Sequence, residues 1–336
     1  MTLRPLRLRG EIPRGRVRMI PVAHWVATAT TTITLLEGTK MKSITRHRTL
    51  TTRLGLLALA IVLFAGSPVS AQEIAHSQFF PILARTAGAG GTQWVTDMTI
   101  HNMTDSDLEV GVLFLEADVA NIFNPAFPDR FNLAPRETLL IQDVLNTLFG
   151  FDTDIKGSML VTVDSERILV NPAGAEILAT TRTYNTGDPA GTFGQTVPAL
   201  GWTINASATT SVVTGVINST RFRSNLGIAS LSLLASIKVH YRVIDGDGDV
   251  VAEGRKTLQP ASVSQWSLQS LGVPKDDGPL TIELWLDPSD VIPDPCATNF
   301  PNMFIGYVSK VDGNPDGTGD AEFIYAAPND PYDCQY

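Results

Sequence analysis

The stretch TQWVTDMTIHN (residues 92–102) decides the fold, because it aligns without gaps on TRFRSNLGIAS (residues 220–230). The matched apolar pairs are Trp94 with Phe222, Met98 with Leu226, and Ile100 with Ile228. Apolar residues an even number of positions apart are typical of a β-strand that buries one face. The sequence therefore predicts the same strand at two places in the chain.

Four further blocks repeat in the same order. Residues 108–114 match 237–243, 133–135 match 258–260, 157–163 match 278–284, and 177–185 match 304–312. Apolar residues alternate in two of these blocks, 108–114 and 157–163, and in their matches. After residues 133–135 the apolar spacing changes to that of a helix, at Ile141, Val144, Leu145 and Leu148. Each copy is therefore expected to hold several short strands and one short helix.

These repeats predict an all-β protein of two tandem antiparallel β-sandwich, Ig-like domains that arose by internal duplication. The segments between strands are rich in Gly, Pro, Asn and Asp and lack the long amphipathic helix of a βαβ unit. We expect the first domain at residues 79–196, the second at 197–328, and a C-terminal tail at 329–336.

An export signal is predicted before the first domain. Residues 54–64 form an uncharged apolar run of 11 residues, preceded by the basic residues Lys42, Arg46, Arg48 and Arg53. As a helix this run would span about 16 Å, too short for a hydrocarbon core of about 30 Å. The small residues before Gln72 suit a signal peptidase, so residues 41–71 are predicted to be a signal peptide cleaved after Ala71.

Residues 1–40 need a separate explanation, because Met41 is a natural start for that signal peptide. We expect them to be a mis-annotated upstream extension, since the codons for Glu37 and Gly38 give a purine run like a bacterial ribosome-binding site. A basic N-terminal arm is the alternative. N-terminal sequencing of the exported protein distinguishes the two.

The charge of the exported chain limits its partners. The full chain has 25 Lys+Arg and 34 Asp+Glu. Cleavage after Ala71 leaves 14 basic and 32 acidic residues, a net charge of −18. Such a chain repels phosphates, so neither nucleic acid nor anionic lipid is an expected partner. No later apolar run is long enough to span a membrane, so membrane insertion is not expected either.

The chain has two cysteines, Cys296 and Cys334, both near its C-terminal end. In an oxidising compartment they are expected to form a disulfide that ties down the tail. Two free thiols are the alternative.

One acidic loop has the spacing of a calcium site. Residues 312–320 (DGNPDGTGD) place oxygen-bearing side chains at positions 1, 3, 5 and 9 and a glycine at position 6. The candidate ligands are Asp312, Asn314, Asp316 and Asp320, and Ca²⁺ is the one candidate cofactor. Position 12 is Phe323 where an EF-hand has glutamate, so a solvated acidic turn is the alternative.

Other polar features have ordinary structural explanations. The acidic segment at residues 245–249 (DGDGD) favours a hairpin turn over a metal site. His76, His101 and His240 belong to no catalytic motif. Arg182 and Tyr184 point to the same face of a predicted strand, where they form either a sugar-binding row or a cation packed on an aromatic ring.

Several segments resemble a family of secreted bacterial proteins of unassigned function, built from Ig-like, adhesion-module-like β-sandwich repeats. The likeness lies in residues 91–97 (GTQWVTD), 182–185 (RTYN), 191–195 (GTFGQ) and 223–227 (RSNLG). The chain departs from the family after residues 306–312, where the loop is longer. The resemblance implies the fold and export, and it implies no catalytic residues.

Together these features favour a secreted or cell-surface, non-enzymatic structural or interaction module that binds protein or polysaccharide. One alternative is an extracellular polysaccharide hydrolase with carboxylates in a groove between the domains. Another is a calcium-rigidified adhesin segment.

Overall fold

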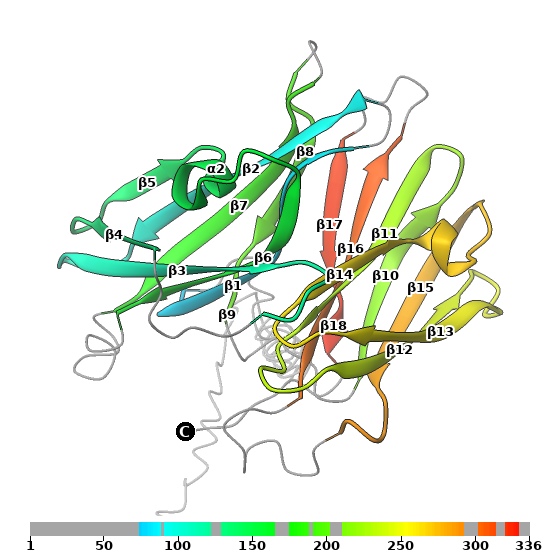
Figure 1. The fold of residues 1–336 in the computed structure, drawn as a ribbon. Coiled ribbons are helices and arrows are strands. Elements are labelled where there is room, and N and C mark those ends of the chain that lie inside the picture. The colour runs from blue at the N-terminus through cyan, green and yellow to red at the C-terminus, as the bar shows by residue number, and fades with distance from the viewer. Residues whose placement is uncertain are drawn as a thin grey trace, which may run out of the picture. The chain divides into compact units, whose positions relative to one another are not determined.

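The computed structural model describes residues 74–88, 91–121, 129–164, 175–187, 191–201, 210–291, 302–313 and 320–328. All of them belong to one compact unit, residues 68–336. Antiparallel strands account for most of this part of the chain (Figure 1). The prediction of an all-β protein is therefore confirmed.

The described residues of the first half form nine strands and one α-helix. They are β1 (Ser77–Ala87), β2 (Gln93–Asn102), β3 (Leu108–Glu116), β4 (Asp129–Leu133), β5 (Thr138–Ile141), α2 (Val144–Phe149), β6 (Ile155–Val163), β7 (Ile177–Asn185), β8 (Gly194–Pro198) and β9 (Leu200–Gly201). The strands hydrogen-bond in the order β4-β3-β6-β1-β2-β7-β8, while β5 pairs with β2 and β9 with β1.

Strand β1 links the two layers of this half. Its residues Ser77 to Arg85 pair with β6, whereas Thr86 and Ala87 pair with β2. The register with β6 shifts between Phe80 and Leu83. Pro81 lies within this irregularity, where the backbone N–H group that proline lacks is not needed to hydrogen-bond with β6. Side chains from both layers then meet in one core that includes Phe80, Met98 and Val161.

In the second half, the part of the chain that the structure describes forms nine further strands. They are β10 (Thr210–Asn218), β11 (Phe222–Ser230), β12 (Ile237–Ile244), β13 (Val250–Leu258), β14 (Val263–Ser267), β15 (Asp276–Leu286), β16 (Phe304–Asp312), β17 (Ala321–Tyr325) and β18 (Ala327–Pro328), with the 3₁₀-helix η3 at Leu268–Leu271. One sheet has the order β13-β12-β15-β10-β18 and the other β14-β11-β16-β17. A second core lies between them, around Leu226, Ile282 and Phe304.

The strands predicted from the repeats are present in both halves. Residues 92–102 and 220–230 contain β2 and β11, and 177–185 and 304–312 coincide with β7 and β16. The aligned strands also pair in the same register. Trp94 on β2 lies opposite Asn185 on β7, and the residues aligned with them, Phe222 on β11 and Asp312 on β16, lie opposite each other as well. The helix predicted after residues 133–135 is α2, whereas the second half has the shorter η3 in that place. β9 lies beyond residue 196, where the first domain was expected to end, yet it pairs with β1.

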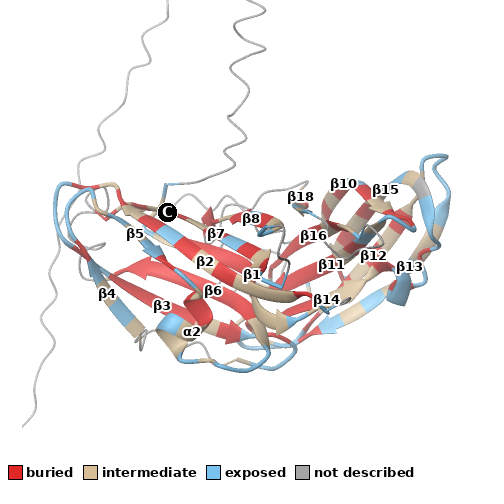
Figure 2. Ribbon diagram, turned by 90° about the horizontal axis from the view of Figure 1, so that it is seen from above, coloured by how far each residue is buried: buried red, intermediate tan, exposed pale blue. Residues whose placement is uncertain are grey.

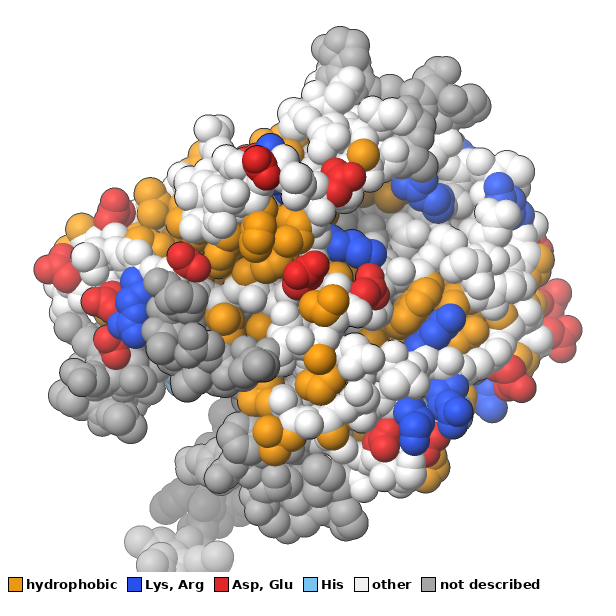
Figure 3. Space-filling view, viewed as in Figure 1, with side chains coloured by type: hydrophobic (Ala, Val, Ile, Leu, Met, Phe, Trp, Pro, Cys, Tyr) orange, Lys and Arg blue, Asp and Glu red, His pale blue; other side chains and the backbone are white. Residues whose placement is uncertain are grey.

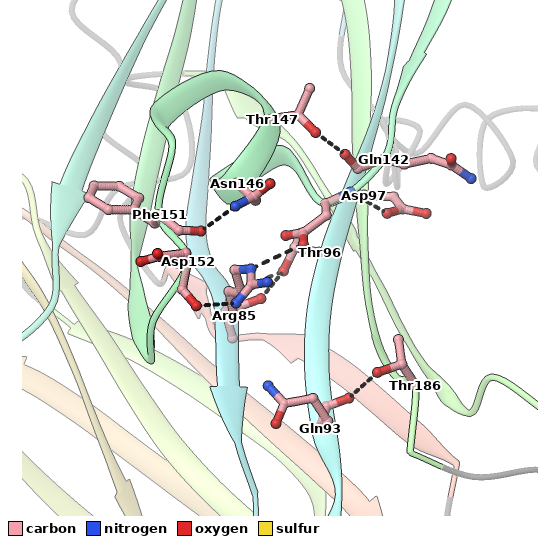
Figure 4. A network of polar contacts seen from close by, with 12 residues as sticks. Arg85, Gln93, Thr96, Asp97, Gln142, Asn146, Thr147, Phe151, Asp152 and Thr186 are labelled. Atoms are coloured by element: carbon pink, nitrogen blue, oxygen red, sulfur yellow. Dashed lines mark hydrogen bonds and ion pairs between the residues drawn. The ribbon is translucent and has the colours of Figure 1, made fainter.

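A polar network fastens α2 to the neighbouring strands (Figure 4). Arg85 donates from Nε to the carboxylate of Asp143, at 3.1 Å, and from Nη1 to the carbonyl of Asp152, at 3.0 Å. The backbone nitrogen of Asp143 donates to the carboxylate of Asp97 on β2. The helix is only 6 residues long, so these contacts compensate for its low intrinsic stability.

A third core joins the two halves. It combines apolar residues on the outer face of β1, β3 and β6 with residues of β11, β14 and β16, including Phe79, Leu115, Ile305 and Tyr307. Strands in this position are buried on both faces, as the long buried stretches of β6 and β16 show (Figure 2). The two halves are therefore joined by apolar packing of the kind found inside a domain.

Backbone and side-chain hydrogen bonds support this junction. Asp118 donates from its backbone nitrogen to the carbonyl of Val263, at 2.9 Å. The amide of Asn121 donates to the carbonyl of Ala261, and the hydroxyl of Tyr325 donates to the carbonyl of Pro198. These bonds fix the segment after β3 and the end of β8 against the second half.

Several sequence predictions fall outside the described residues. They are the upstream extension, the signal peptide with its cleavage after Ala71, the tail at 329–336, and the disulfide between Cys296 and Cys334. Across the described ranges, the protein has no helix with the length and apolar character needed to cross a bilayer.

Candidate functional site

A cavity of about 140 Å³, lined by both polar and apolar side chains, lies where the two halves meet. We call it the junction cavity. Its lining comes from strands of both halves: Ile82, Ala84, Thr86, Trp94, Lys156, Thr183 and Gln195 from the first, and Arg223, Asn225, Gln265, Ser309, Val311 and Ala321 from the second. The cavity continues the face on which the third core lies, because β1 contributes Ile82 to both. Thus apolar residues of the third core pack at one end of the junction, and the cavity with its polar side chains lies at the other.

On the side of the first half, the lining has an indole, an ammonium, two hydroxyl groups, one side-chain amide and two aliphatic side chains. Trp94 is half-buried on β2, and its Nε1 donates to the hydroxyl of Thr92 at 3.0 Å. Gln195 accepts a hydrogen bond at 2.9 Å from the hydroxyl of Ser309, across the junction. Lys156 lies 3.4 Å from the carboxylate of Asp118. These contacts hold the wall in place, and both Trp94 and Lys156 belong to the cavity lining.

On the side of the second half, three polar residues on β11 and β14 line the cavity: Arg223, Asn225 and Gln265. Arg223 and Asn225 alternate along β11 with Ser224 and Leu226, which are buried on the other face. Gln265 lies on β14, beside β11. Within the described ranges the side chains of Arg223, Asn225 and Gln265 make no hydrogen bond or ion pair with the protein. Their donors and acceptors are therefore available to a ligand.

The charged side chains that line the cavity are basic, and the carboxylate of Asp118 lies next to one of them. The lining includes Lys156 and Arg223 and no carboxylate. Figure 3 shows Lys and Arg side chains (blue) in the middle of this face, with Asp and Glu side chains (red) close beside them. The groove with paired carboxylates that a hydrolase would need is therefore not formed by the described residues that line this cavity.

The predicted calcium loop is described only at its two ends. Asp312 ends β16 and Asp320 precedes β17, and the backbone nitrogen of Asp312 donates to the carbonyl of Asp320 at 2.8 Å. The carboxylate of Asp312 accepts charge-assisted hydrogen bonds from both Nε and Nη2 of Arg221, the shortest at 2.8 Å. Asn314 and Asp316 lie outside the described residues. The calcium site stays a prediction, and Arg221 would compete with a cation for Asp312.

The segment at residues 245–249 forms the turn that joins β12 to β13. Asp245 accepts hydrogen bonds on its carboxylate from the backbone nitrogens of Asp247 and Asp249. Gly248 has a φ of 92°, a conformation that favours glycine. The turn explanation therefore accounts for the spacing of this acidic segment.

The side chains of Arg182 and Tyr184 contact each other on the exposed face of β7. The guanidinium carbon of Arg182 lies 4.9 Å from the centre of the Tyr184 ring, and Arg182 also donates to the carbonyl of Thr192. Burial raises the pKa of the Tyr184 phenol, and Asp97, which accepts its hydrogen bond, raises it further. The cation-on-aromatic arrangement is thus present.

A charged cluster on the outer face of the second half was not predicted from the sequence. His240 on β12 stacks on Trp285, with ring centres 5.3 Å apart, and its Nε2 lies 3.0 Å from the carboxylate of Asp287. Asp287 also accepts hydrogen bonds from the hydroxyl and backbone nitrogen of Ser289. The Ser289 hydroxyl first, then His240, hold the pKa of Asp287 well below its usual range.

This lowered pKa predicts a pH dependence of stability. A carboxyl group with a lowered folded pKa stabilises the fold above its unfolded pKa of about 3.9, and the stabilisation is lost as the pH falls below that value. Urea unfolding at pH 5 should show the wild type more stable than Asp287→Asn, and the gap should narrow at pH 2.5. An equal gap at both pH values would show that the charge of Asp287 does not contribute.

These features define an all-β protein of antiparallel, sandwich-type sheets, with a cavity lined by polar, apolar and basic side chains at the junction of its two halves. No protein-family model and no curated protein matches the sequence. Among solved structures, the crystal structure of Thermotoga maritima 1070 is similar, at 15% identity and a TM-score of 0.29, over 37% of this chain and 97% of that one.

Two enzyme structures share a weaker likeness. A glycosyl hydrolase family 2 member from Bacteroides cellulosilyticus has 9% identity and a TM-score of 0.14, over 74% of this chain and 27% of that chain. A beta-glucuronidase from Bacteroides uniformis has 9% identity and a TM-score of 0.15, over 75% of this chain and 26% of that chain. This chain thus spans about a quarter of each enzyme. Scores this low carry no argument about its activity.

Proposed function

We propose that this protein is an exported, non-enzymatic binding module that recognises a polysaccharide at the junction cavity. The observation that carries the proposal is the lining: an indole, two unpaired side-chain amides, hydroxyls and cations, without a carboxylate. Sugars bind proteins through hydrogen bonds to their hydroxyl groups and through contact of their C–H faces with aromatic rings.

The architecture supports a module of two related domains. In the first half, one layer has the strand order β4-β3-β6-β1-β9 and the other has β5-β2-β7-β8. Adding nine to each label gives the two sheets of the second half, β13-β12-β15-β10-β18 and β14-β11-β16-β17. We therefore propose that the halves are Ig-like sandwiches that arose by duplication, with a junction that neither half could form alone. The signal peptide predicted at residues 41–71 supports export.

The binding proposal predicts the effect of two substitutions. On a glycan array probed with the mature protein, Trp94→Ala and Gln265→Ala should each weaken retention of any bound glycan by roughly tenfold, because each removes about 1–2 kcal/mol of contact. Trp285→Ala removes an indole outside the cavity and is the matched control. Thermal unfolding of all three variants checks that they remain folded.

Two results would contradict this function. Release of new reducing ends from a bound glycan would show that the protein is a hydrolase. Equal loss of binding in Trp94→Ala and Trp285→Ala, with both variants folded, would place the glycan outside the junction cavity.

A further inference from the structure

We propose that the sugar unit bound at the junction cavity is acidic, and that Arg223, with Lys156, binds its anionic group. This inference rests on the proposed polysaccharide-binding function and specifies the class of glycan. The anion is a carboxylate or a sulfate ester on the sugar, since both present the planar or forked oxygens that a guanidinium binds in a bidentate manner.

The first observation is that Arg223 lacks a partner. Every other arginine in the described ranges has one: an acidic residue for Arg85, Arg130, Arg136, Arg221, Arg242 and Arg255, and Thr192 for Arg182. Arg223 makes no ion pair and no side-chain hydrogen bond in that part of the chain, although acidic residues outnumber basic ones. The chain as a whole repels polyanions, so the attraction for an anionic group must be local: the two cations of the cavity lining supply it, and the exposed guanidinium of Arg223 is available for contact.

The second observation is that the acidic partner of Lys156 is easily replaced. Asp118 lies 3.4 Å from the Lys156 ammonium, but the carboxylate side chain is 55% exposed and the lysine side chain 39% exposed. Such an exposed pair contributes at most about 1 kcal/mol. An anion in the cavity can therefore share the ammonium with Asp118 without a large loss.

The third observation is the set of neutral groups beside the two cations. Asn225 lies two residues after Arg223 on the same face of β11, and Gln265 lies on the adjacent strand. Both amides have free donors and acceptors, which suit the hydroxyl groups next to the acidic substituent of a sugar ring. A simple inorganic anion would leave these amides unused.

The test compares acidic glycans with neutral ones that are otherwise the same. An array carries two acidic glycans, oligogalacturonate and a sulfated galactan oligosaccharide. It also carries the neutral form of each: carboxyl-reduced oligogalacturonate and the desulfated galactan oligosaccharide. The mature wild type should bind at least one acidic glycan and bind its neutral form roughly tenfold to a hundredfold more weakly. Retention should also fall as salt is raised from 0.05 M to 0.5 M.

Three variants locate the effect on the protein. Arg223→Gln should lose roughly tenfold to a hundredfold in affinity for the acidic glycan while its affinity for the neutral form stays the same. Lys156→Met should lose less. Arg136→Gln removes a positive charge from an exposed pair away from the cavity and is the matched control. Binding of carboxylated but not sulfated glycans, or the reverse, identifies the anion, and either result supports the proposal.

Failure of this inference can be told apart from failure of the proposed function. If neutral and acidic glycans bind equally well and Trp94→Ala weakens both, the cavity binds polysaccharide but the acidic class is wrong. If no glycan on the array is retained, both proposals are overturned. If Arg223→Gln and Arg136→Gln weaken acidic glycans equally, general charge attraction explains the binding and the assigned role of Arg223 is wrong.

Discussion

Tyr307→Ala is expected to lower the free energy of unfolding by about 3–5 kcal/mol, the usual cost of removing a fully buried aromatic ring. Tyr307 is 0% exposed in the core that joins the two halves. Its ring stacks on Phe323, with centres 4.8 Å apart, and covers Gly227, where a Cβ atom would collide with the ring. Urea unfolding of the mature protein, followed by tryptophan fluorescence, measures the change.

Tyr307→Phe is the matched control for this prediction. The phenol oxygen is buried and has no hydrogen-bond partner in the described part of the protein, and burial raises the pKa of the phenol. Removing a buried hydroxyl that lacks a partner should leave stability unchanged or increase it slightly. A loss in Tyr307→Phe as large as that in Tyr307→Ala would show that the hydroxyl, not the ring, stabilises the junction.

Asn102→Ala is expected to destabilise the protein by at least about 2 kcal/mol, because it leaves several buried polar groups without partners. Asn102 is 0% exposed at the end of β2. Its amide nitrogen donates to the carbonyls of Ser106 and Ala134, at 2.7 and 2.9 Å, and its oxygen accepts from the backbone nitrogen of Thr104. One side chain thereby fixes the β2–β3 and β4–β5 connections.

Two further variants test this explanation by the same urea measurement. Asn132→Ala removes an exposed amide on β4 and should change stability by no more than about 0.5 kcal/mol. Asn102→Asp keeps the shape but loses the donor and buries a charge, so it should cost more at pH 7 than at pH 4. If Asn102→Ala proves as mild as Asn132→Ala, the connections are held by other contacts.

The strands could be predicted because their signal is local. Alternating apolar residues in β2, β3, β7, β12 and β16 each bury one or both faces, and the repeat of these blocks identified matching strands in both halves. The helix after residue 140 was also predictable, since its apolar spacing changes from strand to helix period. Local rules could not show that η3 is a 3₁₀-helix, because a segment of 4 residues has no resolvable period.

The junction cavity could not be predicted, because it depends on contacts between residues far apart in the chain. Arg223 and Asn225 were noted only for their place in a repeated segment, and neither Lys156 nor Gln265 belongs to a motif. One signal did exist: residues 304–308 (FIGYV) are continuously apolar, which is typical of a strand covered on both faces. That run indicates a second layer over β16 but not which strands supply it.

The central claim is that a saccharide binds at the cavity formed by both halves. Hydrogen–deuterium exchange of the mature protein, with and without the best glycan from the array, tests it most directly because it locates the ligand on the chain. The account predicts slower exchange in peptides from both halves, covering residues 82–96 and 221–226, and no change around Asp245 to Asp249. Slower exchange confined to one half, or to the turn at residues 245–249, would contradict it.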